Sequence, residues 1–428
     1  MFTQQTYTPI LTTADAIGIV KRTLRMIDKR LIDHGERVAY LVYNMLTLED
    51  LSQSEIGDIC IAAAFHDIGA YKTEEIDRMT QFEMGDVINH SIYGYLFLKH
   101  LSPLGKFSEA VLYHHSRYDK LEHMSIKHKS AALLIHLCDK LDLLASAFPN
   151  SDKFPEQYIR EQSGKIFHPQ QVDNFLALNH KLHLLDKLRD GSFAGHMLDY
   201  FASLNFSISQ IGKYLFMMVC SIDFRSEYTV AHTITTQSIS VELSRRLGYR
   251  GETLAKIFYG AMLHDIGKIS TPLEILEKRG ELTAQEYAIM QEHVVNTRNI
   301  LSSIVDHDVC ELASRHHERI DGSGYPLGLT AAMMSEPEEI IAVADVISAL
   351  CGKRSYKESV SDEAVIAILT DEMECGRFPR RICELAIAEY ADIMAAVSSS
   401  CKPILDMYKN LVGESDRLCA MFNRWDAI

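Results

Sequence analysis

Apolar residues recur along most of the chain at the three- and four-residue spacing of an α-helix, with little of the alternation that marks a β-strand. Helix-start signals point the same way. Ser52 is followed three residues later by Glu55, and Thr283 by Glu286, in the pattern of a capping box. We therefore predict an all-α protein.

One of these apolar stripes ends in two polar residues. Ile257, Ala261 and His264 fall at i, i+4 and i+7, and Asp265 comes next. A carboxylate and an imidazole that are buried together are costly unless something compensates both, and a metal ion does so. The alternative is an ordinary hydrogen bond between the two side chains.

The chain contains the same helical pattern twice. His66 follows His34 by 32 residues, and His264 follows His232 by the same 32 residues. Two copies in the same order predict two tandem domains, which we place at residues 1–204 and 205–428, with extra C-terminal helices from about residue 395. The remaining matched pairs are His90 with His293, His114 with His316, His115 with His317, and Asp139 with Asp345.

Seven imidazoles and carboxylates of the second half fall at or beside positions that periodicity would bury. Each alone could be a satisfied core residue, but together they hold too many imidazoles for too few partners. The set exceeds the shell of one metal and suits two ions bridged by a carboxylate. Iron or manganese is favoured, with nickel, cobalt or zinc as alternatives. The candidate ligands are His232, His264, Asp265, His293, His316, His317 and Asp345.

Three cationic residues of the second half are placed to take charge from a phosphate. Lys268 follows His264 by one helical turn, and Arg354 and Lys357 follow Asp345 at the end of its helix. The alternative for Arg354 and Lys357 is a solvated basic face.

A loop with two glycines lies between the paired histidines and Asp345. Gly322 and Gly324 permit positive φ, and Pro326 stiffens the exit of the loop. Tyr325 is thereby presented from a loop, where its ring could stack on a nucleotide base.

Residues 225–385 resemble the HD-GYP phosphodiesterases, which are named for His-Asp and Gly-Tyr-Pro. The matching segments include Tyr228 to His232, His264 to Lys268, and residues 316–326. The resemblance implies hydrolysis of a cyclic dinucleotide to a linear, 5′-phosphorylated one at a site with two or three metals. Members with three metals carry a glutamate four residues before the first ligand histidine. Tyr228 stands there, so we expect two ions.

The resemblance also implies a role for each matching residue. Asp265 and Lys268 are the expected catalytic residues. One ion would be held by His232, His264, Asp265 and Asp345, and the other by Asp265, His293, His316 and His317. The expected substrate contacts are Lys268, Arg319, Tyr325, Arg354 and Lys357.

The first half departs from the family around its ligands. Ala70 stands where Lys268 stands, Phe148 where Arg354 stands, and no Gly-Tyr-Pro follows the paired histidines. We predict a degenerate HD domain with a structural or regulatory role. A metal-loaded domain without turnover and a second active site are the alternatives. Its candidate, vestigial ligands are His34, His66, Asp67, His90, His114, His115 and Asp139.

The tandem arrangement resembles bacterial phosphodiesterases of 3′,3′-cyclic GMP-AMP. That makes this dinucleotide the leading substrate, with cyclic di-GMP as the alternative. Two further hypotheses stay open: an HD-type nucleotidase or (d)NTP hydrolase, and a signalling scaffold that binds the dinucleotide without cleaving it.

Composition narrows the remaining choices. A net charge of −15 opposes non-specific binding to nucleic acid or anionic membranes, so we expect no DNA or membrane partner. The nine cysteines stand singly, which argues against a disulfide framework. The start of the chain lacks the pattern of a signal peptide, and no apolar run is long enough for a membrane span. We expect a cytoplasmic protein whose N-terminal domain is an intramolecular partner, with a homodimer left open.

Overall fold

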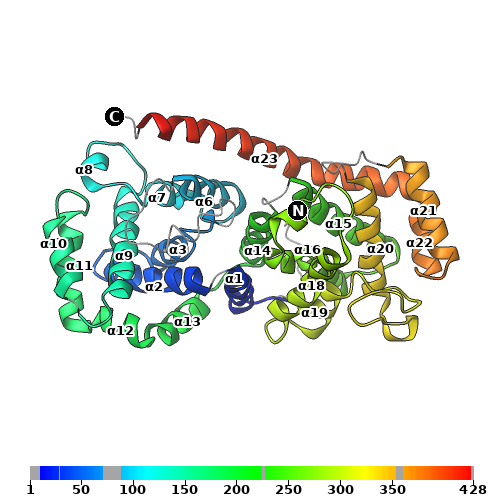
Figure 1. Cartoon of the computed structure of the whole chain (residues 1–428), viewed down its shortest axis with the longest axis horizontal. Helices are drawn as coiled ribbons and strands as arrows, with labels where there is room; N and C mark the ends of the chain where they lie inside the picture. The colour runs from blue at the N-terminus through cyan, green and yellow to red at the C-terminus, as the bar shows by residue number, and fades with distance from the viewer. Residues whose placement is uncertain are drawn as a thin grey trace. The chain divides into compact units, whose positions relative to one another are not determined.

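The computed structural model describes residues 10–27, 29–70, 88–151, 153–223, 227–352 and 360–425 (Figure 1). Every regular element within these ranges is a helix, and the β contacts there are two isolated bridges. The prediction of an all-α protein is confirmed. No helix in this part of the chain combines the length and apolar character that a membrane crossing requires.

The described residues form two compact units. One, the C-terminal unit, falls within Met1–Met26 and Met218–Lys409; the other, the N-terminal unit, falls within Ile27–Met217 and Asn410–Ile428. Each unit therefore includes a segment from the opposite end of the chain. The chain changes unit within three helices: at the end of α1 (Thr13–Ile27), in α14 (Ile208–Asp223) and in α23 (Tyr390–Trp425).

The N-terminal unit is built around α2 (Lys29–Leu46), which packs against α3 (Gln53–Ala64) and α9 (Lys129–Ala147). Leu41 and Leu137, on α2 and α9, are fully buried. The capping box at Ser52 and Glu55 forms as expected and begins α3. The other helices of this unit are α6 (Ile88–Leu101), η1 (Gly105–Phe107), α7 (Ser108–Leu112), α8 (Tyr118–Leu121), α10 (Lys153–Glu161), α11 (Pro169–Leu182), α12 (Leu184–Asp190), α13 (Phe193–Ser203), and the first part of α14 and last part of α23 (Tyr390–Trp425).

The C-terminal unit repeats this plan with α15 (Glu227–Arg246), which packs against α16 (Gly251–Leu263) and α20 (Glu336–Cys351). The apolar stripe of α16 is buried, since Ile257 and Ala261 form a core cluster with Leu312 and Ile341. The other helices of this unit are α1 (Thr13–Ile27), η2 (Ile266–Ser270), α17 (Leu273–Leu276), α18 (Ala284–Leu301), α19 (His307–Ser314), η3 (Ala331–Met333), α21 (Asp362–Glu374), α22 (Arg380–Ala388), and the first part of α23.

The two halves also share a close contact between backbone segments at a glycine. A Cβ atom added to Gly69 would lie 2.0 Å from the carbonyl oxygen of His90, and one added to Gly267 would lie 2.0 Å from that of His293. Only glycine fits at such a distance. In both halves, it lets the turn after the His-Asp pair press against the helix that carries the next histidine.

Helix α1 completes the C-terminal unit, although it lies at the other end of the sequence. Ile19 and Val20 are buried on it. The Arg22 guanidinium caps the carbonyl end of α18: Nη1 donates to the oxygens of Ile300 (3.4 Å) and Ser302, and Nη2 to Ser303 Oγ (3.0 Å). These carbonyls are among those that a helix leaves without partners, and a cation is favourable there.

We expect Arg22→Ala to destabilise the C-terminal turn of α18. The loss should be about 1–3 kcal/mol, because charge-assisted hydrogen bonds to backbone carbonyls are removed. Hydrogen–deuterium exchange of residues 298–304 in the full chain should quicken, and thermal unfolding should begin earlier. Arg22→Lys retains the charge but loses the forked geometry of the guanidinium. Its exchange rate and unfolding temperature should therefore lie between those of the wild type and Arg22→Ala. An Ala variant with unchanged exchange would contradict the capping role.

Candidate metal centre

The His-Asp pair of the C-terminal unit lies where one helix stops and another begins. Helix α16 ends at Leu263 and η2 begins at Ile266, so His264 and Asp265 occupy the break. Thr297 on α18 closes it: Thr297 Oγ1 donates to the His264 oxygen (2.9 Å) and accepts from the Gly267 nitrogen (3.0 Å). The buried backbone groups of the break are thereby satisfied, and the pair is held against α18.

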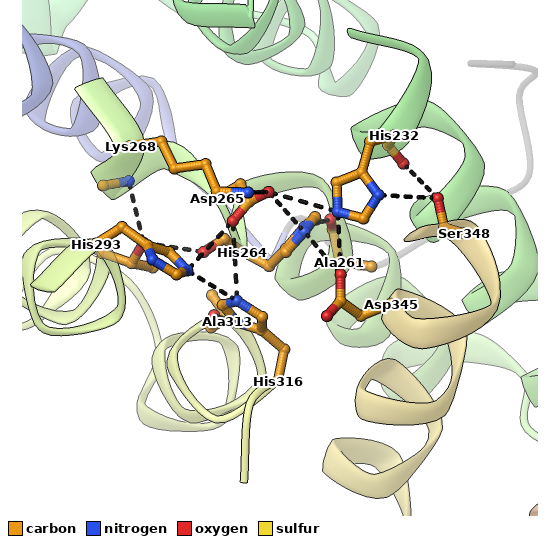
Figure 2. Close-up of polar contacts among 12 residues, drawn as sticks. His232, Ala261, His264, Asp265, Lys268, His293, Ala313, His316, Asp345 and Ser348 are labelled. Atoms are coloured by element: carbon orange, nitrogen blue, oxygen red, sulfur yellow. Dashed lines mark hydrogen bonds and ion pairs between the residues drawn. The ribbon is translucent and has the colours of Figure 1, made fainter. Parts of the chain in front are cut away.

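Asp265 is the centre of the cluster, and its two oxygens face different imidazoles (Figure 2). Asp265 Oδ2 lies 3.6 Å from His232 Nε2 and 3.2 Å from His264 Nε2. Asp265 Oδ1 lies 3.4 Å from His293 Nε2 and 3.8 Å from His316 Nε2. A carboxylate with this arrangement can bridge two ions.

Asp345 on α20 provides a second carboxylate. Its Oδ1 lies 3.0 Å from His232 Nε2 and 3.7 Å from His264 Nε2, and its Oδ2 lies 3.6 Å from His317 Nδ1. The structure thus brings together all seven side chains that the sequence singled out in this half.

Most of the imidazoles are oriented by the backbone. The Nδ1 atoms of His264, His293 and His316 lie 2.8, 2.6 and 2.9 Å from the carbonyl oxygens of the residues three positions earlier. An Nδ1–H that donates to a carbonyl leaves Nε2 as the free lone pair, and here Nε2 points into the cluster.

His232 is oriented by a side chain instead. Ser348 Oγ donates to the carbonyl oxygen of His232 (3.0 Å) and lies 3.0 Å from His232 Nδ1. Because the hydroxyl proton is used on the carbonyl, the oxygen accepts Nδ1–H, and Nε2 is left free. Sequence reasoning missed Ser348. Its signal was the position one helical turn after Asp345, on the same face of α20.

The protonation states suit metal binding. Burial lowers the pKa of His293 to about 4 and that of His317 to about 3, so both rings are neutral at neutral pH. Burial acts to raise the pKa of Asp265, but His264 and Lys268 outweigh it and hold the pKa well below its usual range. Neutral imidazole and ionised carboxylate are the forms that bind metals.

Two buried atoms test whether an ion fits. His264 Nε2 and Asp265 Oδ1 have no hydrogen-bond partner within the described part of the chain. Leaving them so is costly, and a cation would satisfy both. Two groups have ligand atoms that all lie within 4.8 Å of one another: His232, His264 and Asp265, and His293, His316 and His317. The mixed nitrogen and oxygen donors suit transition metals.

Lys268 and Tyr325 flank the cluster. Lys268 Nζ lies 2.5 Å from Asp265 Oδ2 (Figure 2). The Tyr325 ring stacks on that of His317, with 4.7 Å between centroids and 25° between planes. Burial raises the pKa of the Tyr325 phenol, so it stays protonated and can donate a hydrogen bond.

The loop that carries Tyr325 is held by a buried acid. Glu318 accepts from the backbone nitrogens of Leu327 (2.7 Å) and Leu329 (2.9 Å). The expectation for the two glycines holds only for Gly322, which has φ +83. Gly324 is needed for a different reason, because a Cβ there would lie 2.3 Å from the Arg319 nitrogen.

The other expected substrate contacts are less directly placed. The Arg319 guanidinium lies 4.6 Å from the centroid of the Phe378 ring, and its Nη1 donates to the backbone carbonyl oxygen of Glu318 at 2.8 Å. Its contact with substrate stays a prediction. Arg354 and Lys357 lie outside the described residues, as does the side chain of Tyr228.

The N-terminal unit also brings its seven matched residues together. Asp67 lies 3.3 Å from His66 and 3.5 Å from His90, and Asp139 lies 3.2 Å from His34 and 3.7 Å from His115. His114 Nε2 lies 3.6 Å from Asp67 Oδ1. Burial acts to lower the pKa of His34, but Asp139 and Asp142 raise it to about 10.

Family models for an HD domain match residues 31–144 and residues 218–382. The two matches coincide with the two clusters. They include every candidate ligand in each half.

Named relatives align with most of the chain or with a little under half of it. The 3′3′-cGAMP-specific phosphodiesterase 1 of Vibrio cholerae is 30% identical over 390 residues, which cover 87% of this chain and 90% of that protein. A cyclic di-GMP phosphodiesterase of Thermotoga maritima is 33% identical over 200 residues, which cover 45% of this chain and 50% of that protein. The crystal structure of a cyclic GMP-AMP specific phosphodiesterase from V. cholerae matches with a TM-score of 0.54 and 16% identity, covering 92% of this chain and 98% of that chain. This last similarity supports the fold.

We expect Ser348→Ala to weaken metal binding by the C-terminal cluster about 10–100-fold, because His232 loses the partner that sets its tautomer. Mn²⁺ titration of the full chain, followed by calorimetry, measures this. Ser348→Thr keeps the hydroxyl and should restore much of the affinity. Ser240→Ala is the matched control, since Ser240 is a buried serine of α15 that donates to the Thr236 carbonyl. Equal affinities for the Ser348→Ala and Ser240→Ala variants would contradict the orienting role.

Proposed function

The chain belongs to the HD-GYP phosphodiesterases, and from this premise we propose that it hydrolyses a cyclic dinucleotide at the cluster around Asp265. The observation that carries the proposal is the two-faced placement of Asp265. Its Oδ2 lies 3.6 Å from His232 and 3.2 Å from His264, and its Oδ1 lies 3.4 Å from His293. This is the arrangement that a pair of ions requires.

The leading substrate is 3′,3′-cyclic GMP-AMP. The relative named for that substrate aligns over 87% of this chain, including both halves. The T. maritima relative named for cyclic di-GMP aligns over 45%. Cyclic di-GMP is the second candidate.

The reaction adds water across one phosphodiester bond. The oxygen of water forms a bond to phosphorus, the bond from phosphorus to the 3′-oxygen breaks, and that oxygen takes a proton. The product is a linear dinucleotide with a 5′-phosphate. Two divalent ions, iron or manganese first, would supply an activated water and charge neutralisation when bound.

The protein's own residues have separate tasks. Lys268, whose Nζ lies 2.5 Å from Asp265 Oδ2, is placed to offset negative charge that develops on the phosphate. Tyr325 covers the His317 side of the cluster and can donate a hydrogen bond or present its ring to a base. His293 and His317, whose pKa values are lowered by burial, are neutral at neutral pH and can bind as neutral ligands.

Catalysis is assigned to the C-terminal half because the first half lacks Lys268 and the Gly-Tyr-Pro segment at the matching positions. Ala70, fully buried, stands in the first half where Lys268 stands in the second. The first half also has no Gly-Tyr-Pro after His115. Its ligand-like residues remain, but a lysine placed to neutralise phosphate is absent from the matching position.

We expect Asp265→Ala to abolish hydrolysis of both dinucleotides, because the bridging carboxylate is lost. Full-length protein is incubated with each dinucleotide and Mn²⁺ or Fe²⁺, and products are identified by mass spectrometry. Asp67→Ala removes the matching carboxylate of the first half and should retain turnover. Loss in Asp67→Ala as complete as in Asp265→Ala would refute the C-terminal assignment. Hydrolysis of deoxynucleoside triphosphates in place of dinucleotides would favour a nucleotidase. Binding of a dinucleotide without formation of product would favour a signalling scaffold.

Lys268→Gln should lower kcat about 10²–10³-fold while metal content is retained, because the loss falls on charge that develops during the reaction. Steady-state kinetics and metal analysis of the same sample separate the two effects. The control is Lys278→Gln, since Lys278 pairs with Glu286 at 2.5 Å outside the cluster. A Lys268→Gln variant with normal kcat would exclude the assigned role.

A further inference from the structure

The cluster of the N-terminal unit preserves the carboxylate–imidazole distances of the C-terminal one. Asp67 Oδ2 lies 3.7 Å from His34 Nε2 and 3.3 Å from His66 Nε2, where the C-terminal values are 3.6 and 3.2 Å. Asp67 Oδ1 lies 3.5 Å from His90 Nε2 and 3.6 Å from His114 Nε2, where the C-terminal values are 3.4 and 3.8 Å.

The second carboxylate agrees equally well. Asp139 lies 3.2 Å from His34 and 3.7 Å from His115, against 3.0 and 3.6 Å for Asp345 with its two histidines. A domain retained only for its fold has no need for these positions, since apolar residues would fill the core at less cost. The centre differs in one printed contact, since His90 Nε2 lies 2.9 Å from His115 Nε2, whereas the carboxylate–imidazole distances are retained.

Several atoms of this cluster are buried and aimed at one another without hydrogen bonds. His66 Nε2, Asp67 Oδ1 and Asp139 Oδ2 have no such partner within the described part of the chain. His66 is fully buried, and Asp139 is 2% exposed. The Nδ1 atoms of His66 and His114 lie 2.7 and 2.5 Å from carbonyl oxygens, which directs Nε2 inward. Such atoms call for a cation.

One feature is unique to the N-terminal cluster. Asp142, one helical turn after Asp139, occupies the place that Ser348 has in the other half, and its Oδ2 lies 2.7 Å from His34 Nδ1. Arg37 holds this carboxylate through two hydrogen bonds, Nε to Oδ1 at 2.5 Å and Nη2 to Oδ2 at 2.9 Å. Asp142 is 1% exposed. A carboxylate behind a histidine fixes the ring and makes it a stronger ligand than a hydroxyl does.

We propose that the N-terminal unit holds its own pair of divalent transition-metal ions, in a centre that binds ions without hydrolysing a phosphodiester. His34, His66, Asp67, His90, His114, His115 and Asp139 are its ligands. Asp142 and Arg37 are positioning residues that act through His34. This centre is independent of the hydrolytic one, and it selects the metal-loaded, non-hydrolytic alternative for the first half.

Metal counting in the full chain tests the proposal. After anaerobic reconstitution with Mn²⁺ and desalting, elemental analysis should find about four ions per wild-type chain, about two in Asp265→Ala, about two in Asp67→Ala and about none in the double variant. Spin coupling between Mn²⁺ ions in Asp265→Ala should identify the remaining ions as a pair. An Asp265→Ala protein without bound Mn²⁺ overturns the proposal, whereas wild-type turnover tests the hydrolytic centre separately.

A milder variant avoids dependence on the fold of Asp67→Ala. In the Asp265→Ala background, Asp142→Ser copies the residue of the other half and should weaken Mn²⁺ binding about 10–100-fold. Asp142→Asn keeps the shape of the side chain without its charge, so its Mn²⁺ affinity should lie between those of the unchanged Asp142 and Asp142→Ser. Asp119→Ser is the matched control, since Asp119 is an exposed aspartate of the same unit that pairs with Arg117 at 2.6 Å. Equal Mn²⁺ affinity for Asp142→Ser and Asp119→Ser overturns the role of the Arg37–Asp142–His34 chain.

Discussion

The placement of one buried carboxylate, Asp265, is the constraint on which the C-terminal unit depends. It is 4% exposed and faces imidazoles with both oxygens. An ionised group in that position requires compensation from every side. His264 and Lys268 supply part of it, and the close approach at Gly267 and the hydrogen bonds of Thr297 hold the His264–Asp265 pair in place.

A buried aspartate surrounded by imidazoles occurs twice in the chain, and the residues around the candidate ligands differ between the two clusters. In the C-terminal unit, Ser348 orients the first histidine and Lys268 adds a positive charge beside the bridging acid. In the N-terminal unit, Asp142 and Arg37 orient the matching histidine, and Ala70 replaces the lysine. These differences are the basis on which we propose a hydrolytic centre in the C-terminal unit and an ion-binding centre without hydrolysis in the N-terminal unit.

Neither unit is a continuous stretch of sequence. Helix α1 contributes Ile19, Val20 and the Arg22 cap to the C-terminal unit. The last part of α23 contributes Glu414 to the N-terminal unit, where it accepts from Lys99 at 2.6 Å and lies 2.9 Å from His100. A fragment limited to residues 205–428, the second domain predicted from the sequence, would therefore lack the part of the core and the Arg22 cap that α1 contributes.

The sequence by itself determined the helical class, the duplication and the two sets of candidate ligands, because helix period and fixed spacing are local properties that a chain carries in its order of residues. Tertiary structure alone decided what lies behind the ligands. Ser348 meets His232, Asp142 meets His34, and Arg22 meets the end of α18 across more than a hundred residues in each case. It also showed that a glycine is required at position 324 because the backbone of Arg319 lies too close for a Cβ atom, and not because φ is positive. Such contacts depend on how the helices pack. The periodicity of the sequence shows which face of a helix is buried, but it does not show which distant side chains will meet there.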